Sequence, residues 1–482
     1  MALHSLLEAG AEARVEVTEV VDARAPWEMF AEVARRPYSC FLDSSLSMAR
    51  FGEHSFIGFD PYLVLLTRGG AAILVDREGR EHLLESDPFE ALRAVLASRT
   101  CSRPGGGLPP FLSGGIGFLS YELGRYIERL PCGVTDDLRL PELGICFYDR
   151  VLACDIRSGR KWVAVTTPPG SGSQSAVAET LARLEPGAGR DLTPHEPPQA
   201  EPGSSMEFES GFTRERYLES VRAVKEYILA GDIYQANLSQ RFSAPLLEPA
   251  WDLYRRLRVL NAAPFSAYLN FGDFAVASSS PERFLRLEGR DVETRPIKGT
   301  MPRFDDPEED EASRRTLLES KKDRAELSMI VDLERNDLGR VCEYGSVQVT
   351  EHAVLESYAT VHHLVSTVTG RLHGGRDLVD LLKATYPGGS ITGAPKIRSM
   401  EIIDELEPTE RSIYTGAIGW MGFDGDCDLN IAIRTMIITG GRVYSQVGGG
   451  IVADSDPVSE YEETLHKGRA MFAAVTRQRL DS

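Results

Sequence analysis

Arg295-Pro296-Ile297-Lys298-Gly299-Thr300 places one lysine between a proline and a glycine. Proline fixes one backbone torsion angle and glycine permits a sharp bend, so we expect Lys298 to lie in a tight turn. If burial removes water from its amine, the pKa of the lysine falls and the amine becomes a nucleophile. From these six residues alone, a solvated lysine beside an ordinary turn is the simpler interpretation. The rest of the chain distinguishes the two.

The composition is that of a globular enzyme. The chain has 482 residues, of which 42% are hydrophobic and 26% charged. This length suggests about two to four domain-sized units. A net charge of -19 argues against a polyanionic partner such as nucleic acid. A small anionic substrate is not excluded, because it needs only a local basic pocket.

Cysteine usage and the N-terminus bear on the compartment. The seven cysteines, at positions 40, 101, 132, 146, 154, 342 and 427, form no CxxC pair, which is typical of reduced thiols. Acidic and basic residues interrupt Met1–Val17, so it lacks the apolar core of a signal peptide. No apolar run approaches the length of a membrane span. We therefore expect a soluble, cytoplasmic protein.

The composition changes between residues 167 and 210, which are rich in proline, glycine, serine and glutamate. Such a segment predicts a linker with at most one short helix, near Ala176–Leu184. It separates a strand-rich N-terminal segment, residues 1–166, from a longer segment, residues 211–482. The latter opens with a predicted helix between an N-cap at Thr213 and a stop at Gly231.

A predicted strand, Ile233–Phe242, follows this helix, and its side chains alternate between apolar and polar. The polar face carries Gln235, Asn237 and Ser239. A strand with one polar face either meets solvent or lines a polar cavity, and solvent is the usual case.

Two further predicted helices carry acidic residues three positions apart. Residues 311–333 predict one long helix with Asp323 and Glu326, and Asp456-Pro457 begins a helix with Glu460 and Glu463. Residues three apart lie side by side on a helix. Two such pairs facing each other would form the all-oxygen site that Mg²⁺ prefers.

Ordinary surface acids are the alternative interpretation of these pairs. Lys322 and Lys467 stand four residues from Glu326 and Glu463, at the spacing of exposed ion pairs on a helix. The dipole also favours acids near a helix N-terminus.

Three other stretches are candidates for ligand contact. Thr385–Lys396 collects turn formers, small hydroxyls and a lysine before a helix, where backbone N–H groups can bind an anion. Gly448-Gly449-Gly450 follows a strand over residues 443–447 and would let a ligand approach the backbone. Arg434 is a charge in an otherwise apolar strand, so it needs either an internal acid or a substrate carboxylate.

Several common catalytic patterns are absent from the sequence. It contains no GxSxG, no HExxH and no dinucleotide-binding fingerprint. His362-His363 has no cysteine or carboxylate pattern that would indicate zinc.

Six stretches resemble, in order, those of the chorismate-utilising enzymes, and the resemblance covers residues 211–476. They are Ser280-Pro281-Glu282-Arg283-Phe284, Pro296-Ile297-Lys298-Gly299-Thr300, Asp332-Leu333-Glu334-Arg335-Asn336-Asp337-Leu338-Gly339-Arg340, His363-Leu364-Val365-Ser366, Gly393-Ala394-Pro395-Lys396 and Gly448-Gly449-Gly450-Ile451-Val452-Ala453. The resemblance implies an α+β fold of four layers, α/β/β/α, with two orthogonally packed and mainly antiparallel sheets. Residues 1–166 would contribute strands, and residues 211–482 would form the chorismate-binding catalytic region.

Within this family, Lys298 indicates the branch that aminates chorismate at C4, because anthranilate synthase large subunits have alanine there. Members that add water carry a general-base lysine where this chain has Gln235. The resemblance thus implies that chorismate and ammonia give 4-amino-4-deoxychorismate, on the way to p-aminobenzoate and folate. An anthranilate synthase and a catalytically silent chorismate-binding subunit are the alternatives. The retained charges argue against a silent subunit, because buried charges are costly.

The resemblance also implies individual roles. Lys298 would attack C2 while Glu282 protonates the departing C4 hydroxyl, and ammonia at C4 would then expel the lysine. Mg²⁺ would bind at Glu326 and Glu463, with Glu460 and Asp323 beside it, although the family usually has glutamate at the last position. The chorismate-binding residues would be Thr300, His363, Thr392, Arg434, Tyr444, Gly448, Gly449, Gly450 and Lys467.

The resemblance implies one protein partner and a second ligand. The chain has no glutaminase nucleophile motif, so we expect a separate glutamine amidotransferase subunit to supply ammonia. Leu42-Asp43-Ser44 resembles the motif with which relatives bind tryptophan, and Pro264-Phe265-Ser266 would form the opposite wall. Ser44, Pro264 and Phe265 are therefore candidate tryptophan-binding residues, with solvent-facing turns as the alternative.

Overall fold

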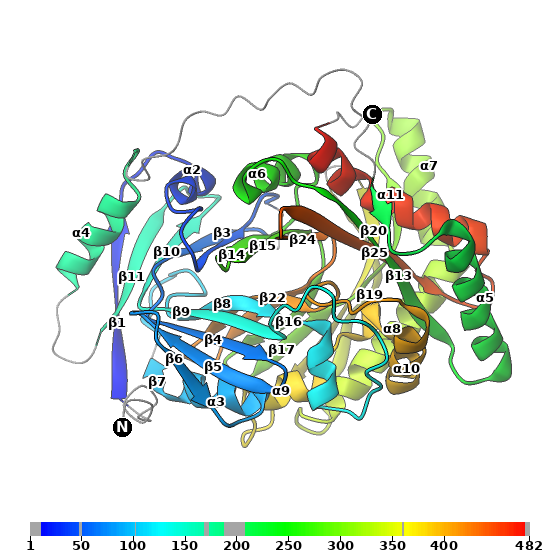
Figure 1. Ribbon diagram of the computed structural model, residues 1–482, viewed down its shortest axis with the longest axis horizontal. Helices are drawn as coiled ribbons and strands as arrows, with labels where there is room; N and C mark the ends of the chain where they lie inside the picture. The colour runs from blue at the N-terminus through cyan, green and yellow to red at the C-terminus, as the bar shows by residue number, and fades with distance from the viewer. Residues whose placement is uncertain are drawn as a thin grey trace.

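Two large sheets stack face to face between outer layers of helices (Figure 1). The structure is a computed structural model, and it describes residues 11–47, 51–101, 103–167, 173–187, 208–358 and 361–477. All strand pairs between named strands are antiparallel except β1 with β7. The expected four-layer α/β/β/α architecture is confirmed.

The first sheet carries the strands that later form one wall of the site. Its order is β12 (Glu209–Ser210), β13 (Gln235–Pro245), β25 (Arg442–Ile451), β24 (Thr435–Thr439), β15 (Phe274–Ser280), β14 (Phe265–Asn270), β2 (Ser39–Asp43), β3 (His54–Gly58), β10 (Arg150–Asp155), β11 (Lys161–Thr167), β1 (Ala11–Val20) and β7 (Arg99–Cys101), with β21 (Gly393–Ala394) pairing β13.

The second sheet carries the lysine-bearing strand at one end. Its order is β18 (Ile297–Pro302), β20 (Val361–Arg371), β17 (Asp291–Arg295), β16 (Arg283–Glu288), β23 (Cys427–Ile431), β22 (Ala417–Gly422), β8 (Gly114–Leu119), β9 (Leu143–Tyr148), β4 (Leu63–Arg68), β5 (Ala71–Asp76) and β6 (Glu81–Leu84), with β19 (Gln348–Ser357) pairing β20.

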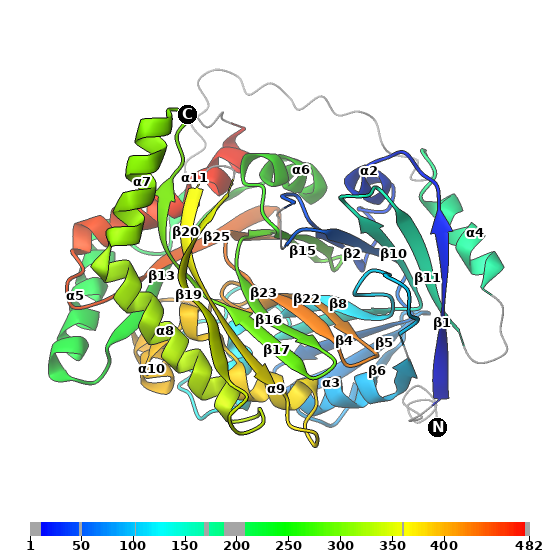
Figure 2. The ribbon, with the colours of Figure 1, turned by 180° about the vertical axis from the view of Figure 1, so that it is seen from behind.

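The helices cover both outer faces. Against the first sheet lie α2 (Pro26–Ala31), α4 (Gln174–Arg183), α5 (Arg214–Ala230), α6 (Ala250–Leu260), α10 (Lys396–Leu406) and α11 (Pro457–Thr476). Against the second lie α3 (Pro88–Ala97), α7 (Pro307–Glu319), α8 (Lys321–Gly339) and α9 (Leu378–Thr385), of which α8 runs beside β19 and β20 (Figure 2). Short 3₁₀ turns span Tyr121–Tyr126 (η1) and Gly389–Ile391 (η2). No described helix has the length and apolar character to cross a membrane.

Four clusters of buried apolar side chains hold the described layers together, and one of them joins α5 and α10 to β13 and β25. The core between the sheets includes the fully buried Phe118 and Tyr148, with Trp420 at its edge. A second core joins the first sheet to helices α2, α6 and α11, and a third joins the second sheet to α3, α8 and α9. Burying each large side chain contributes roughly 1.5–3 kcal/mol, so these cores hold the site's strands and helices in fixed relative positions.

The two sequence segments are interleaved in space. Strand β2 from the N-terminal segment pairs with β14, so that Leu42 faces Ala267. In the second sheet, β8 likewise pairs with β22. The sequence boundary near residue 166 is the end of β11, and each segment contributes strands to both sheets. The helix expected near Ala176–Leu184 is confirmed as α4, while residues 168–172 and 188–207 of the expected linker lie outside the described residues.

Most of the local predictions near the site are confirmed. The hydroxyl of Thr213 accepts a hydrogen bond from the amide of Arg216 at the start of α5, and Gly231 ends this helix with a φ of 84°. The helix predicted from Asp456 is α11, and the Asp456 carboxylate accepts from the Ser459 amide.

The single helix expected over residues 311–333 is wrong. Ser320 is extended, with φ -63° and ψ 105°, and it separates α7 from α8. Its hydroxyl caps α8 by accepting from the Asp323 amide, because a serine side chain can satisfy an amide that has no partner in the first turn. The break lets α8 take its own direction, with Asp323 and Glu326 near its start.

Candidate active site

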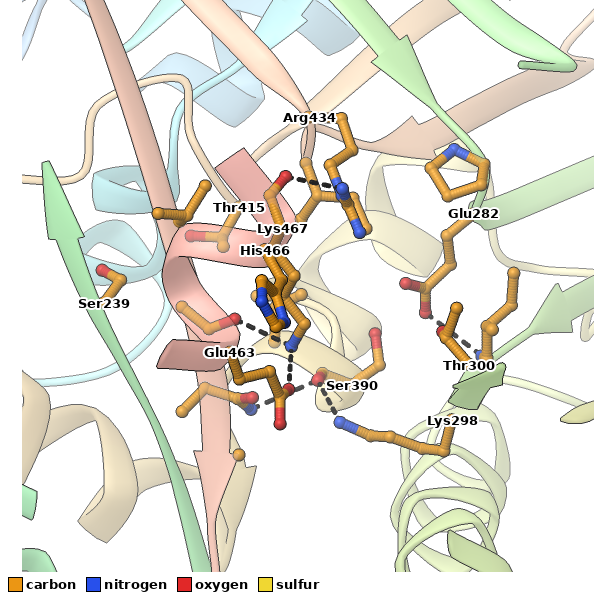
Figure 3. A pocket seen from close by; sticks show the side chains of 18 of the residues that line it. Ser239, Glu282, Lys298, Thr300, Ser390, Thr415, Arg434, Glu463, His466 and Lys467 are labelled. Carbon is orange, nitrogen blue, oxygen red and sulfur yellow. Dashed lines mark hydrogen bonds and ion pairs between the residues drawn. The ribbon is translucent and has the colours of Figure 1, made fainter. Parts of the chain in front are cut away.

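One cavity of about 770 Å³ lies between β13 and β25 of the first sheet, β18 of the second, and helices α8 and α11 (Figure 3). The polar face of β13 contributes Asn237 and Ser239 to its wall. The face therefore lines a polar cavity rather than meeting solvent. Gln235, on the same face, is fully buried next to Gly450 and does not line the cavity.

Lys298 lies in a bulged strand, which corrects the expected turn. The pairing of β18 with β20 shifts register between Lys298 and Thr300, and Gly299 between them has a φ of 72°. A side chain at Gly299 would place its Cβ 2.7 Å from Leu317 Cδ1 and 2.9 Å from Asp323 Cγ. Glycine is therefore required both for the backbone angle and for the space.

The Lys298 amine points into the cavity and donates to the main-chain oxygen of Ser390 at 3.1 Å (Figure 3). Burial lowers the pKa of Lys298, although Glu326 and Glu282 nearby act in the opposite direction. The desolvated, nucleophilic amine foreseen in the sequence fits this geometry better than a solvated lysine.

Glu282 lies on the same side of the cavity as Lys298, in the short connection between β15 and β16 (Figure 3). It is 5% exposed, and its Oε1 lies 3.5 Å from the amide nitrogen of Ile297. Burial raises the pKa of Glu282, although a hydrogen bond with Ser390 and the charge of Lys298 act in the opposite direction. A carboxyl group with a raised pKa holds its proton longer and can serve as a general acid.

The four acids predicted at helical spacing all line this cavity, and they come from two helices. Asp323 and Glu326 project from α8, and Glu460 and Glu463 from α11. Burial raises the pKa of Glu326 and of Glu460. The described residues contain no group of three or more acidic, histidine or cysteine side chains already gathered for a metal.

Both ion pairs of the alternative interpretation form as well. Lys467 Nζ lies 2.6 Å from Glu463 Oε1, and Lys322 Nζ lies 3.9 Å from Glu326 Oε1. Lys467 lowers the pKa of Glu463, although burial opposes it. The acids are thus paired as on a surface helix, but they face a cavity.

The glycine run Gly448–Gly450 lies inside β25 rather than after it. Gly448 and Gly450 line the cavity, whereas Gly449 faces α11. A Cβ at Gly449 would lie 3.3 Å from Glu460 Oε2 and 3.4 Å from Glu463 Oε1. Close approach of the strand to the acids of α11 therefore requires glycine there.

Arg434 corrects the sequence prediction in one respect. It lies between β23 and β24 with a φ of 52°, not inside a strand. Its Nη1 donates to the main-chain oxygen of Lys467 at 2.6 Å, and burial lowers its pKa. None of the described carboxylates forms an ion pair with Arg434. It remains available to a carboxylate in the cavity.

Thr300 and His363 meet at the rim, where Thr300 Oγ1 lies 3.0 Å from His363 Nδ1. Burial lowers the pKa of His363 to about 4, so the ring is neutral near pH 7. His362 points elsewhere, to Asp310 at 2.9 Å and Ser357 at 2.8 Å. This histidine is structural.

Besides Gly449, two further predicted substrate residues, Thr392 and Tyr444, do not line the cavity. The Thr392 hydroxyl is fully buried and donates to the carbonyl of Gly388 at 3.0 Å. Tyr444 packs under the guanidinium of Arg241, 5.4 Å from its ring centre. Lys396, expected near an anion, is 2.6 Å from Asp337 instead. None of Thr392, Tyr444 and Lys396 lines the cavity.

The sequence reasoning singled out none of the polar lining residues Arg411, Tyr414, Thr415, His466 and Arg469. Tyr414 lies close enough to Arg434 to affect its pKa. Thr415 has a φ of 60°, which is unusual for a β-branched residue. No local pattern distinguished Tyr414 from Tyr444, so only the fold could choose between them.

A second cavity, of about 290 Å³, contains the candidate tryptophan-binding residues. Ser44 from the end of β2 and Pro264 and Phe265 from the start of β14 share its wall. Arg283 also lines it, held by Asp428 at 2.8 Å. Neighbouring residues Glu282 and Arg283 therefore face two different cavities.

Comparisons with known proteins agree with this geometry. The family described as chorismate binding enzyme matches residues 42–473. Aminodeoxychorismate synthase component 1 of Bacillus subtilis is 41% identical over 434 residues, 89% of this chain and 91% of that protein. Anthranilate synthase component 1 of Pseudomonas putida is 41% identical over 471 residues, 95% and 94% of the two chains. The crystal structure of anthranilate synthase component I from Streptococcus pneumoniae superposes with a TM-score of 0.76 at 33% identity. The match covers 88% of this chain and 93% of that one.

Proposed function

Because this chain belongs to the chorismate-binding enzyme family, we propose that it converts chorismate and ammonia to 4-amino-4-deoxychorismate. The observation that carries the proposal is the Lys298 amine, half-buried at the cavity wall with a lowered pKa and hydrogen-bonded to the Ser390 carbonyl. Similarity to curated relatives with two different activities is about equal. The chemistry of the site therefore selects between them.

The first half of the reaction uses Lys298 and Glu282. The neutral amine of Lys298 attacks C2 of chorismate, and the ring double bonds shift to expel the C4 hydroxyl. Glu282 gives its proton to that leaving oxygen, which departs as water. The raised pKa of Glu282 favours the protonated form that this step requires.

The second half reverses the shift of the double bonds. Ammonia forms a bond to C4, the double bonds return, and the bond from C2 to Lys298 breaks. The adduct nitrogen keeps both of its protons and leaves as the neutral amine of Lys298, and the proton that the incoming nitrogen loses returns to the Glu282 carboxylate. A covalent intermediate replaces one difficult displacement with two allylic ones.

We further propose Mg²⁺ as the cofactor, bound by Glu326 and Glu463 with Asp323 and Glu460 beside them. The donor set fits, because hard carboxylate oxygens from two helices face one cavity. A cation already stands between the helices, since Lys322 Nζ lies within 4 Å of a carboxylate of each. Bound there, Mg²⁺ would supply charge stabilisation for a substrate carboxylate. Lining waters and that carboxylate would complete the oxygen ligands.

Basic residues suit the two carboxylates of chorismate. Arg434 and Lys467 bind the anionic groups, and Lys467 Nζ is placed by the Gly448 carbonyl at 3.0 Å. Thr300 and neutral His363 offer hydrogen bonds beside the ring. Tyr414 replaces Tyr444 in this proposed set.

A glutamine amidotransferase subunit is the proposed source of ammonia, and p-aminobenzoate and folate synthesis in the cytoplasm is the proposed context. The relatives' names, which end in component 1, support a second component. Tryptophan is the proposed occupant of the second cavity, with Ser44, Pro264 and Phe265 in contact.

Mass analysis of the product from chorismate, ammonium and Mg²⁺ tests the proposal directly. We expect aminodeoxychorismate. Anthranilate with pyruvate would assign the chain to the rival activity, which the Pseudomonas putida relative supports. Unchanged chorismate would instead indicate a silent binding subunit.

A further inference from the structure

Lys322 lies in the first turn of α8, between carboxylates of two helices. Its Nζ is 3.9 Å from Glu326 Oε1 on its own helix and 3.8 Å from Glu460 Oε1 on α11. The side chain is 50% exposed and borders the cavity. The Glu460 carboxylate is fixed in turn by a hydrogen bond of 2.6 Å from Ser455 Oγ.

A lysine in this position needs an explanation. The N-terminus of a helix carries a partial positive charge, so a cation in the first turn is unfavourable. The neighbouring residue Lys321 is exposed and has the same unfavourable interaction with the helix dipole. Only Lys322 is placed between Glu326 and Glu460, whose pKa values are raised chiefly by burial. A positive charge between them relieves their mutual repulsion.

We propose that Lys322 is a built-in counterion that competes with a divalent cation for Glu326 and Glu460. The inference rests on the metal site of the proposed function. Metal binding then requires the Lys322 ammonium to leave the space between α8 and α11. The lysine occupies the space between the two carboxylates while the metal is absent.

The geometry makes this displacement easy. Both nitrogen–oxygen distances exceed that of a hydrogen bond, and half of the side chain already contacts solvent. Exposed pairs of this kind contribute little stability. A divalent ion carries twice the charge and is smaller, so it replaces the ammonium with a moderate loss of affinity.

Binding of Mn²⁺ without chorismate, followed by electron paramagnetic resonance, tests the competition. Lys322→Met should bind Mn²⁺ about tenfold more tightly than the wild type. Lys321→Met is the matched control, because it removes the same charge one residue away on the same helix. It should change the affinity less than about twofold. Equal affinities of the two variants would overturn the competition.

Labelling of the wild-type protein gives a second measurement that needs no variant. Acetylation of lysines, quantified by mass spectrometry with and without Mg²⁺, compares Lys322 with Lys321. Metal should raise the labelling of Lys322 at least about twofold, while Lys321 stays constant. Unchanged labelling of Lys322 with bound metal would contradict displacement. If the wild-type protein binds no Mn²⁺, the metal site itself fails, and the competition with it.

Discussion

The amine of Lys298, on strand β18, donates to the main-chain oxygen of Ser390 in the turn η2 at 3.1 Å. A main-chain carbonyl accepts a hydrogen bond from either the charged or the neutral amine. It can therefore aim the nitrogen without demanding that it keep its proton. The direction of the nucleophile is therefore set by η2, a turn outside the strand that carries Lys298.

Replacing Lys298 tests its role as a nucleophile. Lys298→Ala should lower kcat/KM for amination at C4 by on the order of a thousandfold. Lys298→Arg keeps the positive charge but cannot attack C2, so it should lose activity to a similar degree and still bind chorismate. A chorismate analogue that traps the adduct should label wild-type protein at Lys298. An adduct at another lysine, or an active arginine variant, would reject the assignment.

The pH dependence of adduct formation tests the pairing of Lys298 with Glu282. The step needs neutral Lys298 and protonated Glu282. The single-turnover rate without ammonia should therefore rise with pH as the amine loses its proton, and fall when the carboxyl is ionised. Burial moves the two pKa values toward each other by lowering that of Lys298 and raising that of Glu282.

The variant Glu282→Gln supplies the corresponding control. It should slow adduct formation by about 10²–10⁴-fold, the usual range for loss of a general acid. Its residual rate should rise with pH and then stay level, because no carboxyl remains to ionise. If the rate of adduct formation in this variant still fell at high pH, the ionisation behind that fall would belong to a group other than Glu282.

The metal requirement tests the acids of the two helices. Glu326→Gln or Glu463→Gln should raise the Mg²⁺ concentration for half-maximal activity by roughly ten- to a hundredfold. Chorismate binding should weaken in parallel, since ion and substrate carboxylate share one site. Glu462→Gln, on the exposed side of α11, is the control. Unchanged Mg²⁺ dependence in both site variants would return these acids to the role of surface ion pairs.

The source of nitrogen tests the partner. The chain alone should use ammonium salts best at elevated pH, where more of the ammonia is neutral, and should not use glutamine. Adding the amidotransferase subunit should give glutamine-dependent activity near pH 7. Hydrolysis of glutamine by the isolated chain would contradict the proposed division between two subunits.

The sequence predicted the start of a helix correctly where a capping side chain next to that start determines it. Thr213 and Asp456 cap α5 and α11 with their own side chains, and both helices begin where expected. Ser320 has the same capping chemistry but stands between two helical patterns that read as one. Its role depends on a change in backbone direction that tertiary packing imposes.

The site was predictable to the extent that its chemistry lies in short motifs. Lys298, Glu282 and the acids of both helices meet in one cavity because two sheets bring distant segments together. Tyr414 was missed because it comes from a loop without a periodic pattern, while Tyr444 sits in a clear strand. Which tyrosine faces the ligand depends on sheet packing, and no local pattern encodes it.

The pairing of β2 with β14 and of β8 with β22 has a consequence for biosynthesis of the chain. Strands β2 and β8 each have one early neighbour, β3 and β9, but their other neighbours, β14 and β22, are made only after more than half of the polypeptide. Neither sheet can close on a nascent N-terminal fragment, whose apolar strand faces would meanwhile stay exposed to water. We expect such fragments to depend on chaperones and to aggregate when synthesis stalls. The same pairing suggests that two separately expressed halves could complement each other only by folding together.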